Sequence, residues 1–215
     1  MTHIPCDLII TRHGETEWNL LGRHQGQLDS PLSPLGIAQA EAFGETVREL
    51  PVTAIYASDL GRTMETARII AGRLSIPEII PEPLLREVNF GILQGYTVEE
   101  FRTAHPDIHA RHLERDPDYQ IPGGESLRQF QERTLRGLDD IARRHPGQTV
   151  LVVAHGGNLG CVFRHVFGIP FGAQRRFSLK NVSFNRFTVS DGAWRLETWG
   201  EISHLRKVRA LDELG

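Results

Sequence analysis

The chain has 215 residues, of which 40% are hydrophobic and 24% are charged, and its formal net charge is −3. This composition is typical of a globular protein and excludes a strong basic field that would concentrate the chain on nucleic acid or anionic membranes. The two cysteines, Cys6 and Cys161, have neither a disulfide-framework nor a zinc-type spacing. No stretch reaches the roughly 18 apolar residues of a membrane span, and the N-terminal segment lacks a signal-peptide pattern. We therefore expect a cytoplasmic protein with no nucleic-acid or membrane partner.

Strands and helices alternate in the first part of the chain. The apolar run at 6–11 predicts a strand that is buried on both faces. A short helix is expected at 15–21, and a longer one begins after Ser33, a predicted N-cap. The same order returns with a strand at 53–58 and a helix at 59–74. A strand followed by a helix, twice in succession, indicates an α/β domain.

The middle of the chain breaks this alternation. Residues 84–124 show no sustained periodicity, and they predict a cap-like insertion above the sheet with short helices near 97–104 and 107–115. We expect this insertion to be too short to bury a core of its own, so that residues 1–215 form a single domain. The remaining elements are predicted as a helix at 125–145, a strand at 148–154, a helix at 158–167, and an edge hairpin at 181–189 and 193–200 that could support a homodimer.

Two of the predicted strands end in similar residues. One strand leads into Arg12 and His13, and the other leads into His155. In an open, mostly parallel sheet the ligand crevice lies at the carboxyl ends of the strands, so we expect these side chains to meet. Arg62, in the first turn of the helix that follows a third strand, is expected at the same edge. Helix N-termini there would add backbone N–H donors.

A pocket with two arginines and two histidines suits a compact, multiply charged anion, and phosphate fits best. Arg12 and Arg62 stay charged and can clamp phosphate oxygens with their guanidinium forks. A histidine can lose its proton and attack phosphorus, and we assign this role to His13 because the turn at Gly14 could hold one ring nitrogen on a carbonyl. His155, either cationic or as a neutral donor, would help to neutralise the equatorial oxygens.

Phosphoryl transfer to a poor leaving group also needs a proton donor. Glu87, in the loop that enters the insertion, is the predicted donor, and Glu15, on the nucleophile's own turn, is the competitor. Two histidines and a carboxylate could also form a zinc site. Two arginines in the same pocket argue against a metal, because each would repel a dication at contact range.

Five segments in this order resemble the histidine phosphatase superfamily, which includes the cofactor-dependent phosphoglycerate mutases: "TRHGETEWN", "YASDLGRTMETA", "REVNFGILQG", "PGGESL" and "VVAHGG". The resemblance extends over about residues 7–165. It implies a three-layer α/β/α sandwich around a mostly parallel sheet, a phosphohistidine intermediate, and no metal or other cofactor. The residues that match the family's site are the nucleophile His13, the proton donor Glu87, and the phosphate ligands Arg12, Asn19, Arg62 and His155, to which we add Gln25 and Gly156.

Departures from the mutase pattern favour a phosphatase. The mutase pattern has "HGN" where this chain has "HGG". It also has a longer insertion, with basic residues that bind the second acidic group of a bisphosphate. The insertion here is rich in apolar residues instead. We therefore expect hydrolysis of small phosphorylated metabolites, whose identity the sequence leaves open. A phosphoglycerate mutase is the nearer alternative, and a non-catalytic or regulatory protein that binds a phosphorylated ligand is the other.

Overall fold

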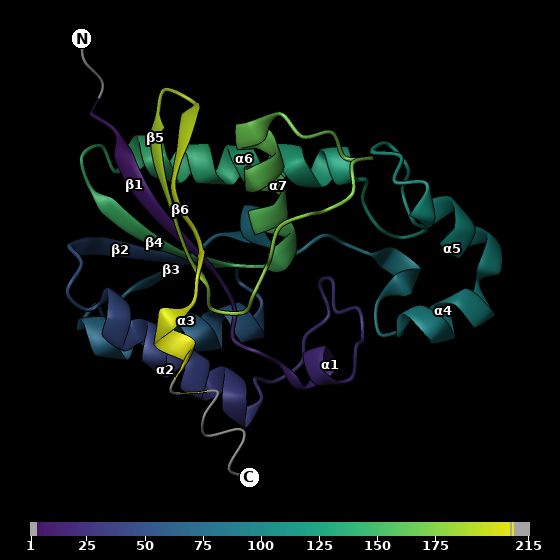
Figure 1. Cartoon of the computed structure of the whole chain (residues 1–215), viewed down its shortest axis with the longest axis horizontal. Coiled ribbons are helices and arrows are strands. Elements are labelled where there is room, and N and C mark those ends of the chain that lie inside the picture. The colour runs from purple at the N-terminus through teal and green to yellow at the C-terminus, as the bar shows by residue number, and fades with distance from the viewer. Residues whose placement is uncertain (1–3, 207, 209–215) are drawn as a thin grey trace.

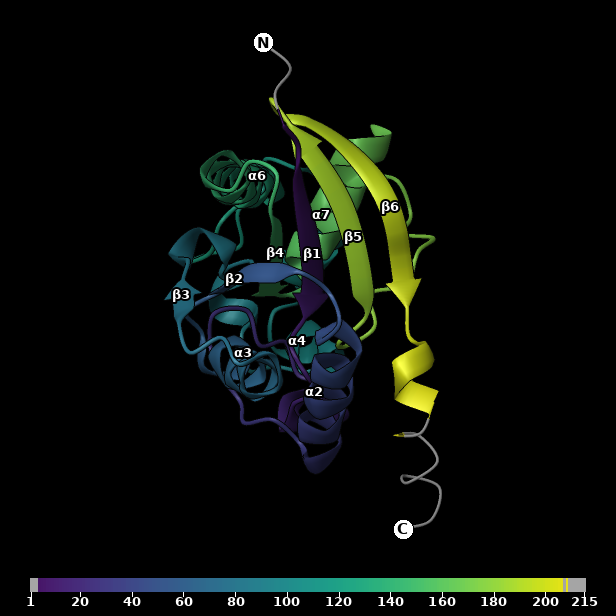
Figure 2. The ribbon, with the colours of Figure 1, turned by 90° about the vertical axis from the view of Figure 1, so that its left-hand side faces the viewer.

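The central sheet combines parallel strands with an antiparallel hairpin at one edge. The computed structural model describes residues 4–206 and 208, and its strands lie in the order β3-β2-β4-β1-β5-β6 (Figure 2). β1, β2, β3 and β4 are parallel, whereas β5 is antiparallel to β1 and β6 to β5. The prediction of a mostly parallel sheet is confirmed. The strands are β1 (Cys6–Arg12), β2 (Val52–Ala57), β3 (Ile79–Pro81), β4 (Thr149–Ala154), β5 (Phe184–Ser190) and β6 (Ala193–Glu201).

Helices cover both faces of the sheet, as Figure 1 shows. In that view α6 and α7 lie above the strands and α2 and α3 lie below them, which confirms the three-layer α/β/α sandwich. Among the described residues, no helix combines the length and the apolar character needed to cross a membrane. The helices are α1 (Glu17–Leu20), α2 (Pro34–Val47), α3 (Gly61–Leu74), α4 (Val98–Ala104), α5 (Pro106–Leu113), α6 (Leu127–Arg144) and α7 (Gly156–Phe167), with 3-10 turns at Pro83–Leu85, Gly91–Leu93 and Ser203–Leu205.

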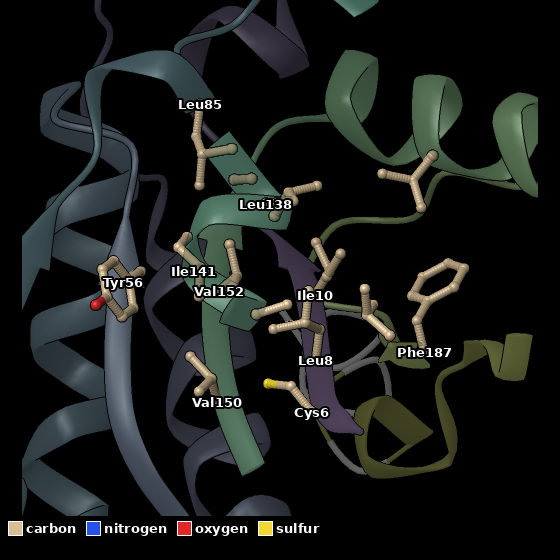
Figure 3. Packing of buried hydrophobic residues seen from close by; sticks show 14 of the residues in the cluster. Cys6, Leu8, Ile10, Tyr56, Leu85, Leu138, Ile141, Val150, Val152 and Phe187 are labelled. Atoms are coloured by element: carbon tan, nitrogen blue, oxygen red, sulfur yellow. The ribbon is translucent and has the colours of Figure 1, made fainter. Parts of the chain in front are cut away.

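The continuous apolar run of β1 supplies both layers of the core. Leu8 and Ile10 point toward α6 and α7, where they pack with Leu138 (Figure 3). Ile9 points to the opposite face and packs with Phe43 of α2. Alternate side chains of a strand face opposite sides of a sheet, so a strand covered on both faces must be apolar throughout.

Four helix starts differ by two residues from the sequence prediction: α3 begins at Gly61 rather than at 59, α6 begins at Leu127 rather than at 125, and α7 and α1 are the other two. α7 begins at Gly156 rather than at Asn158, because Asn158 is the third helical residue and its side chain accepts the backbone N–H of His155. α1 begins at Glu17 rather than at 15, since Thr16 is its N-cap. In α7 and α1 a capping box closes the first turn and sets the start of the helix.

The segment 84–124 buries a small hydrophobic cluster, contrary to our expectation. Leu93, Phe101 and Ile121 are each at most 4% exposed and pack together. Two short helices make this possible, and Figure 1 shows α4 and α5 at a distance from the sheet. The cap-like role of this segment and the single-domain organisation stay predictions.

The turn after β1 packs directly against the start of α2. A Cβ atom at Gly36 would lie 2.0 Å from the carbonyl oxygen of Glu15, and one at Gly14 would lie 2.5 Å from the carbonyl oxygen of Gly36. Both glycines are therefore needed for this close approach of two backbone segments.

We predict that Gly36→Ala lowers the free energy of unfolding by about 1–3 kcal/mol, the usual cost of overpacking. The matched control is Gly72→Ala in α3, where an added Cβ meets no atom within 4 Å. Since glycine weakens a helix interior, that change should stabilise the protein by about 0.5–1 kcal/mol. Urea unfolding curves measure both effects, and equal effects of the two substitutions would contradict the proposed close approach.

Candidate active site

The two histidines meet because β1 and β4 are adjacent parallel strands in register. Arg12 pairs with Ala154, so the residues that follow them leave the sheet at the same edge. The backbone N–H of His13 donates to the carbonyl of Ala154 at 3.0 Å. The rings of His13 and His155 lie 5.3 Å apart between centroids. The expected convergence at the carboxyl ends of the strands is thus observed.

His13 is held in one tautomer by its two neighbours. Nδ1 lies 2.7 Å from the carbonyl oxygen of Gly14, and Nε2 accepts the Nε–H of Arg62 at 3.3 Å. Because an arginine can only donate, Nε2 must carry the lone pair and Nδ1 the proton. The N–H of Gly14 donates in turn to Thr66 Oγ1 at 3.0 Å, which fixes the turn itself. This is the arrangement that the sequence predicted for a histidine nucleophile.

The environment of His13 favours the neutral ring. Burial, together with the positive charges of Arg12 and Arg62, lowers the pKa of His13 well below its usual value of 6.5, against the opposing effect of the hydrogen bond to Gly14. The side chain is only 2% exposed. A neutral imidazole with a free lone pair is the form that can act as a nucleophile.

His155 is also neutral in this arrangement. Its Nδ1 accepts the Nη2–H of Arg62 at 3.1 Å, so the proton is on Nε2, which lies 2.9 Å from Ser58 Oγ. Burial and then the charge of Arg62 lower its pKa well below 6.5. Of the two forms considered for His155, these hydrogen bonds fit the neutral ring, whose Nε2–H is directed at Ser58.

Arg62 is the most heavily bonded side chain of the site. It is 1% exposed, and besides the two histidines it donates to the carbonyls of Gly26 and Leu28, each at 2.8 Å. Asp29 Oδ1 accepts from Nη1 at 3.1 Å and supplies the compensating charge. Because the guanidinium occupies the lone pairs of both imidazoles, the residues do not fit the zinc alternative. No group of three His, Cys, Asp or Glu side chains within the described ranges could hold a metal ion.

Arg12 retains an unused donor. Its Nη1 donates to the carbonyl of Leu179 at 2.9 Å, whereas its Nε is buried and has no partner among the described residues. Buried donors are normally paired, so this N–H calls for an acceptor such as a phosphate oxygen. Gly156 lies beside it, since a Cβ atom there would be 3.6 Å from Arg12 Nε.

Gln25 is another buried side chain of the site with an unused polar atom. Its Nε2 donates to Thr16 Oγ1 at 2.8 Å, and its Oε1 has no partner in the part of the chain that the structure describes. Rotation of the amide by 180° would let the threonine hydroxyl donate to Oε1 and would leave Nε2 as a free donor. Gln25 can therefore present an N–H group to an anion without losing its bond to Thr16.

The Glu87 carboxylate lies against the first turn of α7. Its Oε1 accepts the backbone N–H of Val88 at 2.9 Å, and its Oε2 accepts that of Gly157 at 3.1 Å. Its negative charge lies near enough to Arg12 and Arg62 to raise the pKa of both guanidinium groups, against the effect of their burial. The competitor Glu15 is instead bonded to Ser33 at the start of α2. The structure therefore favours Glu87 over Glu15 as the proton donor.

Asn19 reaches the site through a partner that the sequence did not reveal. Its Oδ1 accepts the N–H of Thr16 at 3.2 Å and an N–H of Asn181 at 3.4 Å. Asn181 also donates to the carbonyl of His13 at 2.9 Å. Asn19 is thus placed one side chain away from the nucleophile, and no described group accepts from its Nδ2.

Four further site residues were missed in the sequence: Ser58, Thr66, Asp29 and Asn181. Ser58 follows β2 directly, so the rule that located the two histidines could have found it. Thr66 lies one helical turn after Arg62, on the same face of α3, which is a weaker signal. Asp29 and Asn181 lie in loops without periodicity, and no sequence pattern connects them with the site.

The chain is similar to known proteins over most of its length. A family model described as "Histidine phosphatase superfamily (branch 1)" matches residues 8–202. The "Probable phosphoglycerate mutase GpmB" of Enterobacter sp. (strain 638) is 40% identical over 210 residues, covering 95% of this chain and 97% of that protein. The "Metal-independent phosphoserine phosphatase" of Arabidopsis thaliana is 38% identical over 205 residues, covering 94% of this chain and 84% of that protein. The solved structure of Bacillus stearothermophilus YhfR superimposes with a TM-score of 0.86 at 32% identity, covering 94% of this chain and all of that one.

We predict that the His13 ring stays neutral at pH 6.5 and protonates only well below that value. The reason is its lowered pKa, and nitrogen NMR of the imidazole measures it, with the urea-unfolded chain as the reference that titrates near 6.5. The pKa of His155 is also lowered in the folded protein. As the pH falls, both histidines therefore bind their protons in the unfolded chain before they do so in the folded protein. The free energy of unfolding should then decrease below pH 6.5 by about 1.4 kcal/mol per unit for each histidine. A ring that titrates at 6.5 or above in the folded protein would contradict this assignment.

We also predict that Gly157→Ala slows catalysis more than it affects stability. A Cβ atom there would lie 2.1 Å from Glu87 Oε1 and 2.9 Å from the ring of Phe130, so the flexible carboxylate must move. A displaced proton donor should lower kcat by about tenfold or more for a substrate with a poor leaving group. Gly160→Ala on the same helix, whose Cβ would be 3.8 Å from Leu179, is the control. The loss should shrink with p-nitrophenyl phosphate, which needs little protonation, and an equal loss on both substrates would contradict the role of Glu87.

Proposed function

Because the chain belongs to the histidine phosphatase superfamily (branch 1), we propose that it is a metal-independent phosphatase that hydrolyses small-molecule phosphomonoesters. Membership and relatives support phosphatase or mutase activity, and the choice of hydrolysis is our own. One observation carries the proposal. His13 is a buried, neutral imidazole that presents a lone pair among the donors of Arg12 and Arg62.

The first step transfers the phosphoryl group to His13. Nε2 attacks phosphorus, a P–N bond forms, and the P–O bond to the alcohol breaks while Glu87 supplies a proton to the departing oxygen. The Nε–H of Arg62, which now donates to Nε2, must turn to a phosphate oxygen to free the lone pair. The Nε–H of Arg12, which has no partner among the described residues, donates to a second oxygen of the phosphate. Arg62 thereby moves one hydrogen bond from the nucleophile to the group being transferred.

The second step releases phosphate. Water attacks phosphorus from the side that the alcohol has left, and Glu87, now a carboxylate, takes its proton. The P–N bond breaks, and its electron pair returns to Nε2 of His13. The hydrogen bond from Nδ1 to the Gly14 carbonyl keeps the ring in the same tautomer throughout, so the enzyme is regenerated without a tautomer change.

Two features favour hydrolysis over mutase activity. A side chain at position 157, as in the "HGN" pattern of mutases, would collide with the Glu87 carboxylate in its present position. In the segment 84–124, Arg102 and Arg111 form ion pairs with acidic residues of that same segment, so their charges are partly compensated. The name of the Enterobacter relative keeps phosphoglycerate mutase as the second candidate.

We predict that wild-type protein releases phosphate from phosphomonoesters in the presence of a chelator and forms an acid-labile phosphoenzyme. His13→Ala should abolish both signals, whereas His165→Ala, an exposed residue of α7, should keep them. With 3-phosphoglycerate as substrate, the rate of phosphate release is compared with the rate of 2-phosphoglycerate formation. Faster isomerisation would identify a mutase. Normal turnover by His13→Ala, or loss of turnover with the chelator, would reject the phosphohistidine mechanism.

A further inference from the structure

The short segment that carries Glu87 lies between two 3-10 turns and has no regular secondary structure of its own. Its backbone polar groups therefore need partners from outside a helix or a sheet ladder. One side chain of α6 supplies several of them. Arg133 donates from Nη1 to the carbonyls of Leu84 and Arg86, each at 2.7 Å. Its Nη2 donates to the carbonyl of Glu87 at 2.9 Å, so a single guanidinium holds the chain up to Glu87.

Glu125 fixes the orientation of this guanidinium. Its carboxylate accepts from Nε and Nη2 of Arg133 at 2.9 and 2.6 Å, and both side chains of this pair are 16% exposed. Its Oε1 also accepts the N–H of Asn89 at 2.8 Å, and its own N–H donates to the carbonyl of Asn89 at 3.0 Å. A bidentate pair of this kind has a defined geometry. The Arg133–Glu125 pair therefore holds the backbone on both sides of Glu87.

The backbone held in this way places the Glu87 carboxylate against the first turn of α7. Gly157 is the second residue of that helix, so its N–H has no acceptor within the helix. Glu87 Oε2 accepts this N–H at 3.1 Å. The next residue of α6 fixes the same turn of α7, since Asn158 Nδ2 donates to Thr134 Oγ1 at 3.0 Å. Arg133 and Thr134, two consecutive residues of α6, thus hold the two parts that meet at the carboxylate.

A second arginine of α6 shows what distinguishes Arg133. Arg128 forms a similar bidentate pair with Asp118, at 2.6 and 3.0 Å, but these side chains are 51% and 63% exposed. Exposed pairs of this kind contribute little to stability. Arg133 has five N–H groups, and it uses three of its five hydrogen bonds on carbonyls of the segment that ends at Glu87. An ion pair with Glu125 alone would not require those three bonds.

We propose that Arg133 is a positioning residue for proton transfer by Glu87, and that Glu125 holds its guanidinium in place. Arg133 acts through the backbone of residues 84–87, which keeps the Glu87 carboxylate at the start of α7. This inference rests on the proposed function of the site and deepens it, because it names the group on which the placement of the proton donor depends.

The first test replaces Arg133 by lysine, which keeps the charge but not the planar fork. The substrates are phenyl phosphate and p-nitrophenyl phosphate, because they differ in how much the departing oxygen needs a proton. Arg133→Lys should lower kcat/KM about tenfold for phenyl phosphate, a part of what a general acid contributes, and much less for p-nitrophenyl phosphate. Arg128→Met is the matched control and should keep the wild-type ratio of the two values. An equal loss on both substrates would overturn the proposal.

A double-mutant cycle shows whether Arg133 acts through Glu87. In a Glu87→Gln background, Arg133→Lys should lower kcat/KM for phenyl phosphate little further, since the group that it positions no longer transfers a proton. The same loss in both backgrounds would mean that the effect bypasses Glu87, and the proposal would be rejected. Should Arg133→Lys fail to fold, the combined change Arg133→Met and Glu125→Gln, which leaves no unpaired charge, replaces it in both tests.

Hydrogen exchange of the Gly157 amide measures the placement of Glu87 without any turnover. Arg133→Lys should accelerate this exchange toward the rate in Glu87→Ala, whereas Arg128→Met should leave it unchanged. The N–H of Leu159, which donates to the carbonyl of His155 at 3.2 Å, is the internal reference. Unchanged protection of Gly157 in Arg133→Lys overturns the proposal. If the wild type hydrolyses neither ester but the exchange responds as expected, the proposed function fails and the placement of Glu87 by Arg133 stands.

Discussion

The burial of one guanidinium, that of Arg62, is the constraint on which the site depends. A buried charge costs several kcal/mol unless every donor finds an acceptor and a counter-charge lies nearby. Here the acceptors are two backbone carbonyls of residues 26–28, the carboxylate of Asp29, and the two histidine rings. Satisfying this one group therefore orders a loop that is otherwise irregular and orients both imidazoles.

The strand ends were predictable because burial leaves a strong signal in the sequence. A short apolar run such as that of β1, with two adjacent isoleucines, favours a strand covered on both faces, and parallel register then brings the residues after β1 and β4 to one edge. His13, His155 and Arg62 follow from this rule without knowledge of a single contact. The sequence also predicted that one ring nitrogen of His13 would be held by a carbonyl at the Gly14 turn, but only the structure identifies it as Nδ1.

The remaining parts of the site were not predictable, for a physical reason. Many of its contacts are to backbone carbonyls, such as those of Gly26, Leu28, Glu87 and Leu179. Every residue has a carbonyl, so no residue type marks these positions. The loop after α7 and the segment 84–124 also lack periodicity, and their placement is set by long-range contacts. Sequence patterns consequently found the groups to which we assign the chemistry but missed those that hold and surround them.

The arginines of this site have two linked effects on the reaction. Burial lowers the pKa of His13, and the positive charges of Arg12 and Arg62 lower it further, which favours the neutral ring. In the mechanism that we propose, the same charges attract the phosphate that this ring attacks. A bound phosphate dianion would offset the effect of the arginines on this pKa, although not the effect of burial. The hydrogen bond from Nδ1 to the Gly14 carbonyl does not prevent protonation of the ring, because it also stabilises the cation. In the proposed mechanism, contact with the phosphorus atom would occupy Nε2, so close packing of phosphate against His13 would help to keep the ring from taking a proton.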